Sequence, residues 1–120
     1  GRKQMQTANL SIDVTAPRNG ASILKLKGAM TGYAEEILMA AYHQACLAEP
    51  RLIILDFSEV EHMNSTGVGL LVTLLIRADR QKQRLAAIGL TSHYLKIFKL
   101  TRLIDAIRPY ADEAEALAAA

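Results

Sequence analysis

The sequence has little of several things that mark particular classes of protein. Only one of its 120 residues, Cys46, is a cysteine, which excludes a disulfide framework and a CxxC metal knuckle. No apolar run approaches the roughly 20 residues that a membrane-spanning helix needs, and no secretory hydrophobic segment opens the chain. From these absences we expect a cytoplasmic protein of a reducing compartment, with no direct membrane insertion.

The sequence also has no large excess of positive or negative charge. Lys and Arg total 14 against 12 for Asp and Glu, a formal net charge of +2 at pH 7. The basic residues are scattered, whereas a nucleic-acid-binding surface needs them clustered, so we predict no nucleic-acid partner. Apolar residues make up 51% and charged residues 22%, which is the balance of an ordinary globular domain with a sizeable core.

The first part of the chain has the period of β-strands. Residues 10–14 and 22–28 alternate apolar and polar side chains, as half-buried strands do. The Asn19–Gly20 pair between them predicts a hairpin turn. Lys25 and Lys27 fall on the outer face of that hairpin, where lysines protect a sheet from edge pairing.

The rest of the chain alternates helix and strand patterns. Strands are predicted at RLIILDF (51–57), RLAAIGL (84–90) and, more weakly, LIDAI (103–107). Helices are predicted over 32–48 with Thr31 or Gly32 as the cap, from Gly67 to about Gln83, from Ser92, and in the tail 111–120. We therefore predict a single α/β domain over 1–120 (core about 10–118), with a mixed, mainly parallel sheet of about five strands, an N-terminal β-hairpin and about four helices.

The stretch MNSTGVGLL (63–71) joins a predicted strand to a predicted helix. Strand-to-helix loops of this kind are where sites gather in open α/β sheets. Gly67 and Gly69 would leave backbone N–H groups accessible at a helix N-terminus, which favours anions, so a phosphorylated hydroxyl would be accommodated there. The alternative is that Asn64, Ser65 or Thr66 is simply the helix N-cap.

No catalytic constellation is visible in the sequence. Ser65 lacks the glycine two residues before it that a nucleophile elbow needs, and no lysine follows Gly67 or Gly69 as in a P-loop. His43, His62 and His93 lie far apart, without the spacing of metal ligands. We predict that the protein is not an enzyme and binds neither a cofactor nor a metal.

From Leu10 to Ala118 the chain resembles the STAS domain, which sulphate transporters and anti-sigma factor antagonists share. Three segments carry the resemblance: ILKLKGAM (23–30), LIILDFSEVEHMNSTGVGLL (52–71) and YLKIFKLTRLIDAI (94–107). The middle segment is similar to the family's strand followed by a D-S-[ST]-G-[hydrophobic]-G signature. The resemblance implies that Ser65 is phosphorylated, with Thr66 as the second candidate.

The resemblance also implies partner switching. An unphosphorylated antagonist binds an anti-sigma factor with a GHKL-type serine kinase fold, phosphorylation by that partner releases it, and a PP2C-like phosphatase resets it. The protein is then a substrate and binder, not a catalyst. The residues implied to contact the partner are Thr31, Gly32, Tyr33, Met63, Asn64, Thr66, Gly67 and Val68.

Three positions depart from the family pattern. Asn64 and Thr31 stand where the antagonists usually carry Asp, and Arg102 stands where a glycine is common at a helix end that tends to adopt positive φ. A second hypothesis is favoured by these two neutral residues more than it would be by a full match to the family pattern. In it the chain is a non-switching STAS interaction module of a sensory complex or of a larger membrane protein.

Overall fold

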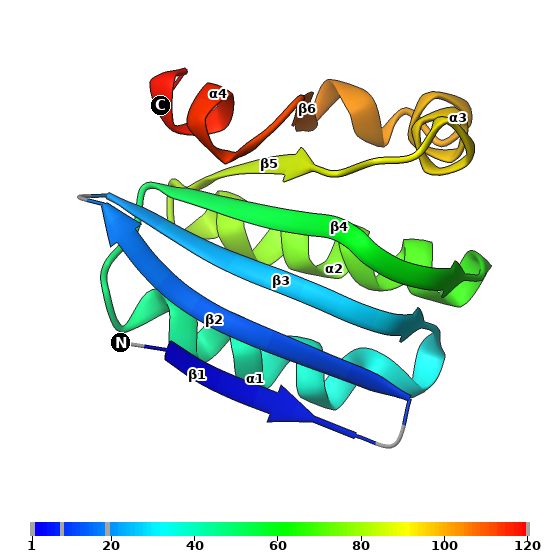
Figure 1. The fold of residues 1–120 in the computed structure, drawn as a ribbon, viewed down its shortest axis with the longest axis horizontal. Helices are drawn as coiled ribbons and strands as arrows, with labels where there is room; N and C mark the ends of the chain where they lie inside the picture. Colours follow the sequence, from blue (N-terminus) through cyan, green and yellow to red (C-terminus); the bar gives the residue numbers. More distant parts are fainter. Residues whose placement is uncertain (1, 8, 19, 120) are drawn as a thin grey trace.

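Six strands form one sheet in the computed structural model, which describes residues 2–7, 9–18 and 20–119. Their order across the sheet is their order along the chain: β1 (Arg2–Gln6), β2 (Leu10–Arg18), β3 (Ala21–Met30), β4 (Leu52–Met63), β5 (Arg84–Ile88) and β6 (Ile107–Tyr110). The pairs β1–β2 and β2–β3 are antiparallel, and the three pairs from β3 to β6 are parallel (Figure 1). This arrangement confirms the predicted mixed, mainly parallel sheet.

The helices cover the two faces of the sheet unequally. The larger core lies between the sheet and α1 (Glu35–Cys46), α2 (Ser65–Arg80) and α3 (Ser92–Leu100), and α1 and α2 lie behind the sheet in Figure 1. A smaller cluster on the other face is covered by α4 (Glu113–Ala118). Because α4 is only six residues long, it covers one end of that face and leaves the rest open.

Two strand predictions need correction. β1 was not predicted, because RKQMQ contains one apolar residue and so has no detectable period. The predicted strand over 103–107 is wrong: Leu103–Asp105 forms a 3-10 turn, η2, and the strand begins at Ile107. Leu103 and Ile107 are both buried, but their spacing of four residues follows a helical turn rather than the alternation of a strand.

β4 is longer than the sequence pattern predicts. It continues past Phe57 through SEVEHM to Met63, because two register shifts against β3 place extra residues in β4. Such bulges bend a strand and interrupt its alternation, so Val60 and Met63 are both buried although three positions apart. As a result only Asn64 separates β4 from α2.

The segment before α1 also differs from the prediction. Antiparallel pairing confirms the β2–β3 hairpin, although Asn19 of its turn lies outside the described residues. Thr31 and Gly32 do not cap α1: Gly32–Ala34 forms a 3-10 turn, η1, and α1 starts after Ala34 with no side-chain cap. The turn runs against α2, since a Cβ on Gly32 would lie 2.8 Å from Thr66 Cγ2. Within the described ranges, no helix is long and apolar enough to cross a membrane.

Candidate functional site

Asn64 is the N-cap of α2. Its backbone is extended, with φ −103° and ψ 180°, and its side-chain Oδ1 accepts a hydrogen bond from the Gly67 N–H at 2.8 Å. The Val68 N–H donates to the Asn64 carbonyl at 3.1 Å and opens the helical ladder. Of the three residues that the sequence offers as caps, the structure selects Asn64, a residue type that caps as well as aspartate does.

Ser65 is therefore free of the capping task. It is the first residue of α2 and is exposed, as is Thr66. Among the described residues, neither hydroxyl has a hydrogen-bond partner, and the backbone N–H groups of Ser65 and Thr66 have no protein acceptor. The first turn of α2 contains no acidic residue. An anion attached to Ser65 would meet free donors and the positive end of the helix dipole.

Gly67 allows α2 to start directly against the end of β3. A Cβ on Gly67 would lie 2.0 Å from the Met30 carbonyl oxygen, a distance that real Cβ atoms do not reach. Gly32, in the turn before α1, similarly lies close to Thr66 Cγ2 of α2. These two glycines bring the Thr31–Tyr33 segment and the start of α2 into contact, so residues far apart in the sequence form one surface.

The exposed side of α2 continues this surface. Ser65, Gly69, Val72 and Ile76 follow one another at spacings of four, three and four residues, which places them on one stripe of a helix. Val72 is 41% and Ile76 49% exposed, and a Cβ on Gly69 would have nothing within 4 Å. Sequence reasoning missed Val72 and Ile76, although their helical spacing from Ser65 could have revealed them.

The other predicted site residues have different surroundings. Tyr33 is 91% exposed beside this surface, an unusual position for a large aromatic side chain. Met63, in contrast, is 8% exposed, and Gly67 is buried, so both support the loop from below. Thr31 and Val68 are half-buried, and Val68 packs against the larger core.

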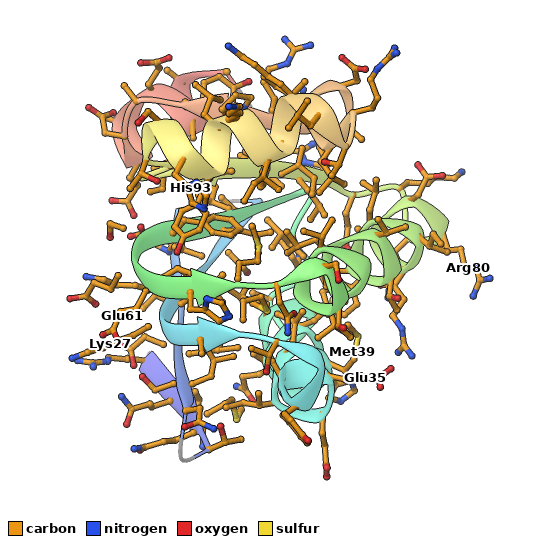
Figure 2. All side chains as sticks on the ribbon, turned by 90° about the vertical axis from the view of Figure 1, so that its right-hand side faces the viewer. Lys27, Glu35, Met39, Glu61, Arg80 and His93 are labelled. Atoms are coloured by element: carbon orange, nitrogen blue, oxygen red, sulfur yellow. The ribbon has the colours of Figure 1, made fainter. Side chains whose placement is uncertain are left out.

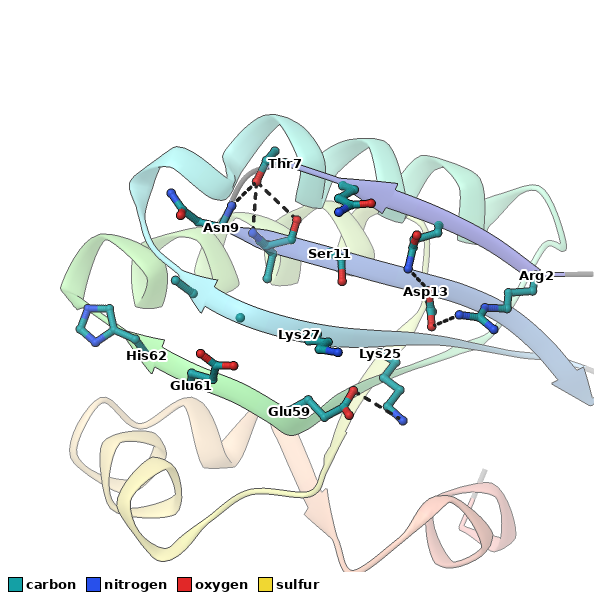
Figure 3. Close-up of a pocket in the computed structure, with 15 residues that line it drawn as sticks. Arg2, Thr7, Asn9, Ser11, Asp13, Lys25, Lys27, Glu59, Glu61 and His62 are labelled. Atoms are coloured by element: carbon teal, nitrogen blue, oxygen red, sulfur yellow. Dashed lines mark hydrogen bonds and ion pairs between the residues drawn. The ribbon is translucent and has the colours of Figure 1, made fainter.

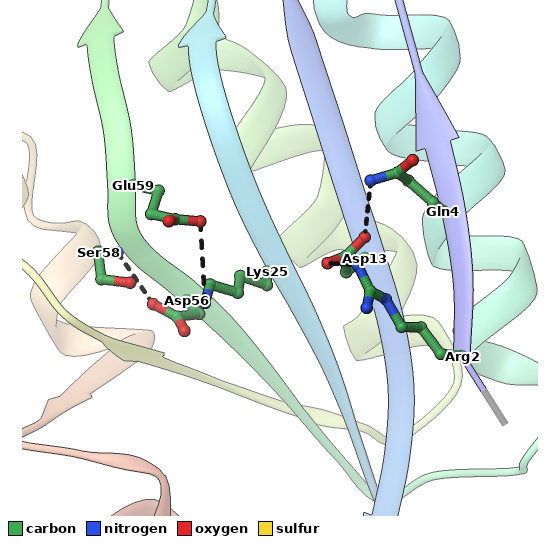
Figure 4. A network of polar contacts seen from close by, with 7 residues as sticks. All are labelled: Arg2, Gln4, Asp13, Lys25, Asp56, Ser58 and Glu59. Carbon is green, nitrogen blue, oxygen red and sulfur yellow. Dashed lines mark hydrogen bonds and ion pairs between the residues drawn. The ribbon is translucent and has the colours of Figure 1, made fainter.

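The open face of the sheet forms a second, polar hollow of about 720 Å³ over β1 to β4. Its charged groups are largely paired with one another. Arg2 Nη2 lies 2.7 Å from Asp13 Oδ2, and Lys25 Nζ lies 3.8 Å from Glu59 Oε2 (Figure 4). Lys27, Glu61 and His62 also line the hollow, with His62 at the end away from Arg2 (Figure 3). Its mutually neutralised charges offer no preference for a ligand of either sign.

The chain as a whole is similar to known proteins. A family model described as "Mlab, STAS domain" matches residues 14–109. That match covers most of the sequence, and the chain belongs to the STAS domain family. The anti-sigma-B factor antagonist of Listeria monocytogenes is 24% identical over 99 residues, which are 82% of this chain and 87% of that protein.

Solved structures show the same fold. An anti-sigma factor antagonist from Mycobacterium paratuberculosis superimposes with a TM-score of 0.77 at 18% identity, over 96% of this chain and 97% of that one. The Bacillus cell fate determinant SpoIIAA in its phosphorylated form gives 0.69 at 21% identity, over 90% and 97%. A sulfate transporter family protein from Wolinella succinogenes gives 0.74 at 17% identity, over 88% of each chain.

Proposed function

We propose that this STAS domain is a partner-switching protein of the anti-sigma factor antagonist type, regulated by phosphorylation of Ser65. The observation that carries the proposal is the exposed Ser65 hydroxyl at the start of a helix whose cap is supplied by Asn64. A kinase can reach that hydroxyl without breaking a capping bond. The protein acts in the cytoplasm as a substrate and binder, not as a catalyst.

The partner is an anti-sigma factor or another serine kinase of the GHKL type, and a PP2C-like phosphatase restores the unphosphorylated form. The partner contacts the exposed surface around Ser65, including Thr31, Gly32, Tyr33, Asn64, Thr66 and Val68, while Met63 and Gly67 hold that surface in place. A phosphate adds about −1.5 to −2 charges. In a complex that covers the helix stripe from Ser65 to the apolar Val72 and Ile76, this charge would have to be desolvated, so phosphorylation releases the partner.

Ser65 is favoured over Thr66 by the contacts of the two side chains. The Thr66 methyl group faces Gly32, where a single added carbon would lie 2.8 Å away. Ser65 lies on the stripe that continues through Gly69. Incubation with a cognate GHKL kinase and ATP should add one phosphate to the wild type and to Thr66→Ala, and none to Ser65→Ala. Intact mass spectrometry measures this, and no phosphate on the wild type with an active kinase would contradict the switch.

The effect on binding is tested by a pull-down of the partner kinase. We expect Ser65→Ala to retain the partner and Ser65→Asp to lose it at least tenfold. Ser92→Asp is the matched control, because Ser92 is also an exposed first residue of a helix, following the cap Thr91, yet lies on another helix. Equal binding by Ser65→Ala and Ser65→Asp would rule out the switch.

A second candidate function has its own support. Asn64 and Thr31 are neutral where antagonists usually carry acids, and a sulfate transporter family protein has the same fold. The domain would then be a constitutive interaction module in a sensory complex or in a larger membrane protein. This function predicts that variants at Ser65 bind the partner as the wild type does, whereas Tyr33→Ala loses binding.

A further inference from the structure

A pocket of about 440 Å³ lies between the second half of α1 and the end of α2, far from Ser65 along α2. We call it the arginine pocket, lined by Met39, Tyr42, His43, Cys46, Arg77, Arg80 and Gln81. The α1 members recur at spacings of three and four residues, so they form one stripe of that helix facing α2. Figure 2 shows Met39 on α1 and Arg80 at the end of α2 on the same side of the molecule.

The pocket carries two positive charges that have no ion-pair partner in the described part of the chain. Among the described residues, no carboxylate lies within 4.0 Å of the Arg77 or Arg80 guanidinium. No acidic residue lines the pocket. Asp79 is two positions from Arg77, and residues at that spacing do not face each other on a helix.

Two lining residues of the pocket are held by part-buried polar contacts with Gln83. The Tyr42 hydroxyl donates a hydrogen bond to Gln83 Oε1 at 2.7 Å, and Gln83 Nε2 approaches Cys46 Sγ at 3.5 Å. Burial raises the pKa of Tyr42 above its ordinary value, and the nearby charge of Arg77 partly opposes that rise. Tyr42 therefore stays a neutral donor, and the arginines supply the charge of the pocket.

A small multivalent anion is a poor match for this place. α1 and α2 both end near it, so helix carbonyls and the negative ends of two dipoles lie close by, and they repel an anion of two or more charges more strongly than a single carboxylate charge. No helix N-terminus offers a cradle of N–H donors there. A carboxylate held on a larger molecule suits the pocket better, because other contacts anchor it and the half-buried Met39 offers an apolar neighbour.

We propose that the arginine pocket binds an aspartate or glutamate side chain of the same partner that the Ser65 surface recognises. This inference rests on the proposed function. Twelve residues separate Ser65 from Arg77, roughly 18 Å along a helix axis. A standard interface of about 800 Å² per partner is some 30 Å across, so a partner docked on Ser65, Val72 and Ile76 reaches the pocket without a second interface.

The pocket is tested separately from the switch with a probe peptide. N-acetyl-Glu-Leu-Glu-amide is titrated into the full chain labelled with ¹⁵N, and the arginine side-chain NMR signals are followed. We expect saturable shifts at Arg77 and Arg80, with affinity at least fivefold lower in Arg77→Gln and Arg80→Gln. Arg108→Gln is the control, because Arg108 is an exposed arginine outside the pocket. Ser65→Asp should bind the peptide as the wild type does.

Several outcomes would overturn the pocket proposal: no shifts, equal binding of N-acetyl-Gln-Leu-Gln-amide, an equal loss in Arg108→Gln, or tighter binding of inorganic phosphate than of the peptide. A stability loss in Arg77→Gln with unchanged peptide affinity would also overturn it, and would assign the arginine to the helix dipole alone. Peptide binding that persists while Ser65 is never phosphorylated would contradict the switch and support the pocket.

Discussion

At the scale of single residues, neighbouring positions at the start of α2 have separate tasks. Asn64 satisfies the Gly67 N–H, which leaves Ser65 exposed and available. The two glycines of the segment also differ. Gly67 touches the Met30 carbonyl, whereas a side chain on Gly69 would point into open space. Gly67 is required by the fold, and Gly69 is available for the close approach of a partner backbone.

This difference predicts opposite effects of the same substitution. Gly67→Ala should lower the free energy of unfolding by about 2 kcal/mol, because the methyl group must push α2 away from β3. Gly69→Ala should raise it by roughly 0.5–1 kcal/mol, since alanine favours a helix interior more than glycine does. Chemical denaturation of both variants measures the two effects, and similar values for the two would contradict the assignment.

At the scale of elements, the turn after α3 holds a strained residue. Arg102 has φ 66° between α3 and η2, a conformation that favours glycine. Its guanidinium Nε lies 3.0 Å from Asp105 Oδ2, but both side chains are well exposed, so the pair stabilises the turn little. The turn places Leu103 in the core, and this burial outweighs the unfavourable backbone of one residue.

Arg102→Gly should therefore stabilise the protein. We expect a gain of about 0.5 kcal/mol, the difference between roughly 1 kcal/mol of relieved strain and the lost surface ion pair. Lys99→Gly, in the last turn of α3, is the control and should lower stability by about 1 kcal/mol. Thermal unfolding distinguishes the two signs, and a destabilised Arg102→Gly would mean that the arginine has a structural contact of its own.

At the scale of the whole molecule, the sheet is protected asymmetrically. Three helices cover one face, and among the described residues α4 is the helix that packs on the apolar end of the other, in one cluster with Ile23, Ile54 and Ile88. Ala116 is the buried contact of α4, at 1% exposure, while Ala114 on the same helix is exposed. The integrity of the second face depends on this one short helix.

Undocking α4 should therefore destabilise the domain and expose apolar surface. Ala116→Asp would place an unpaired charge in the smaller cluster, and we expect a loss of about 2–3 kcal/mol together with increased binding of a hydrophobic dye. Ala114→Asp should change stability by less than about 0.5 kcal/mol. If the two variants unfold alike, α4 does not protect this face.

Much of the fold follows from local patterns. Alternation in residues 10–14 and 22–28 predicted the hairpin, and helical spacing predicted α1 and α2 to within a few residues of their observed ends, and the start of α3 at Ser92. The prediction failed where long-range contacts override local pattern. β1 has almost no apolar signal and exists because β2 pairs with it. The segment 103–107 is apolar enough for a strand, but after the turn at Arg102 its first three residues form a 3-10 turn and the strand begins only at Ile107.

The sequence by itself determined the alternation of strands and helices, the exposed serine before a glycine-spaced helix, and the family to which those features belong. Periodicity and turn chemistry are local properties, so they can be read along the chain. Only the tertiary structure decided that Asn64 is the cap, that Gly32 meets Thr66, and that Arg77 and Arg80 share a pocket with His43. The cap is a local bond whose donor and acceptor only the backbone geometry identifies. The other two contacts join segments brought together by the packing of α1 and α2 on one sheet, and packing is not encoded in the spacing of any single segment.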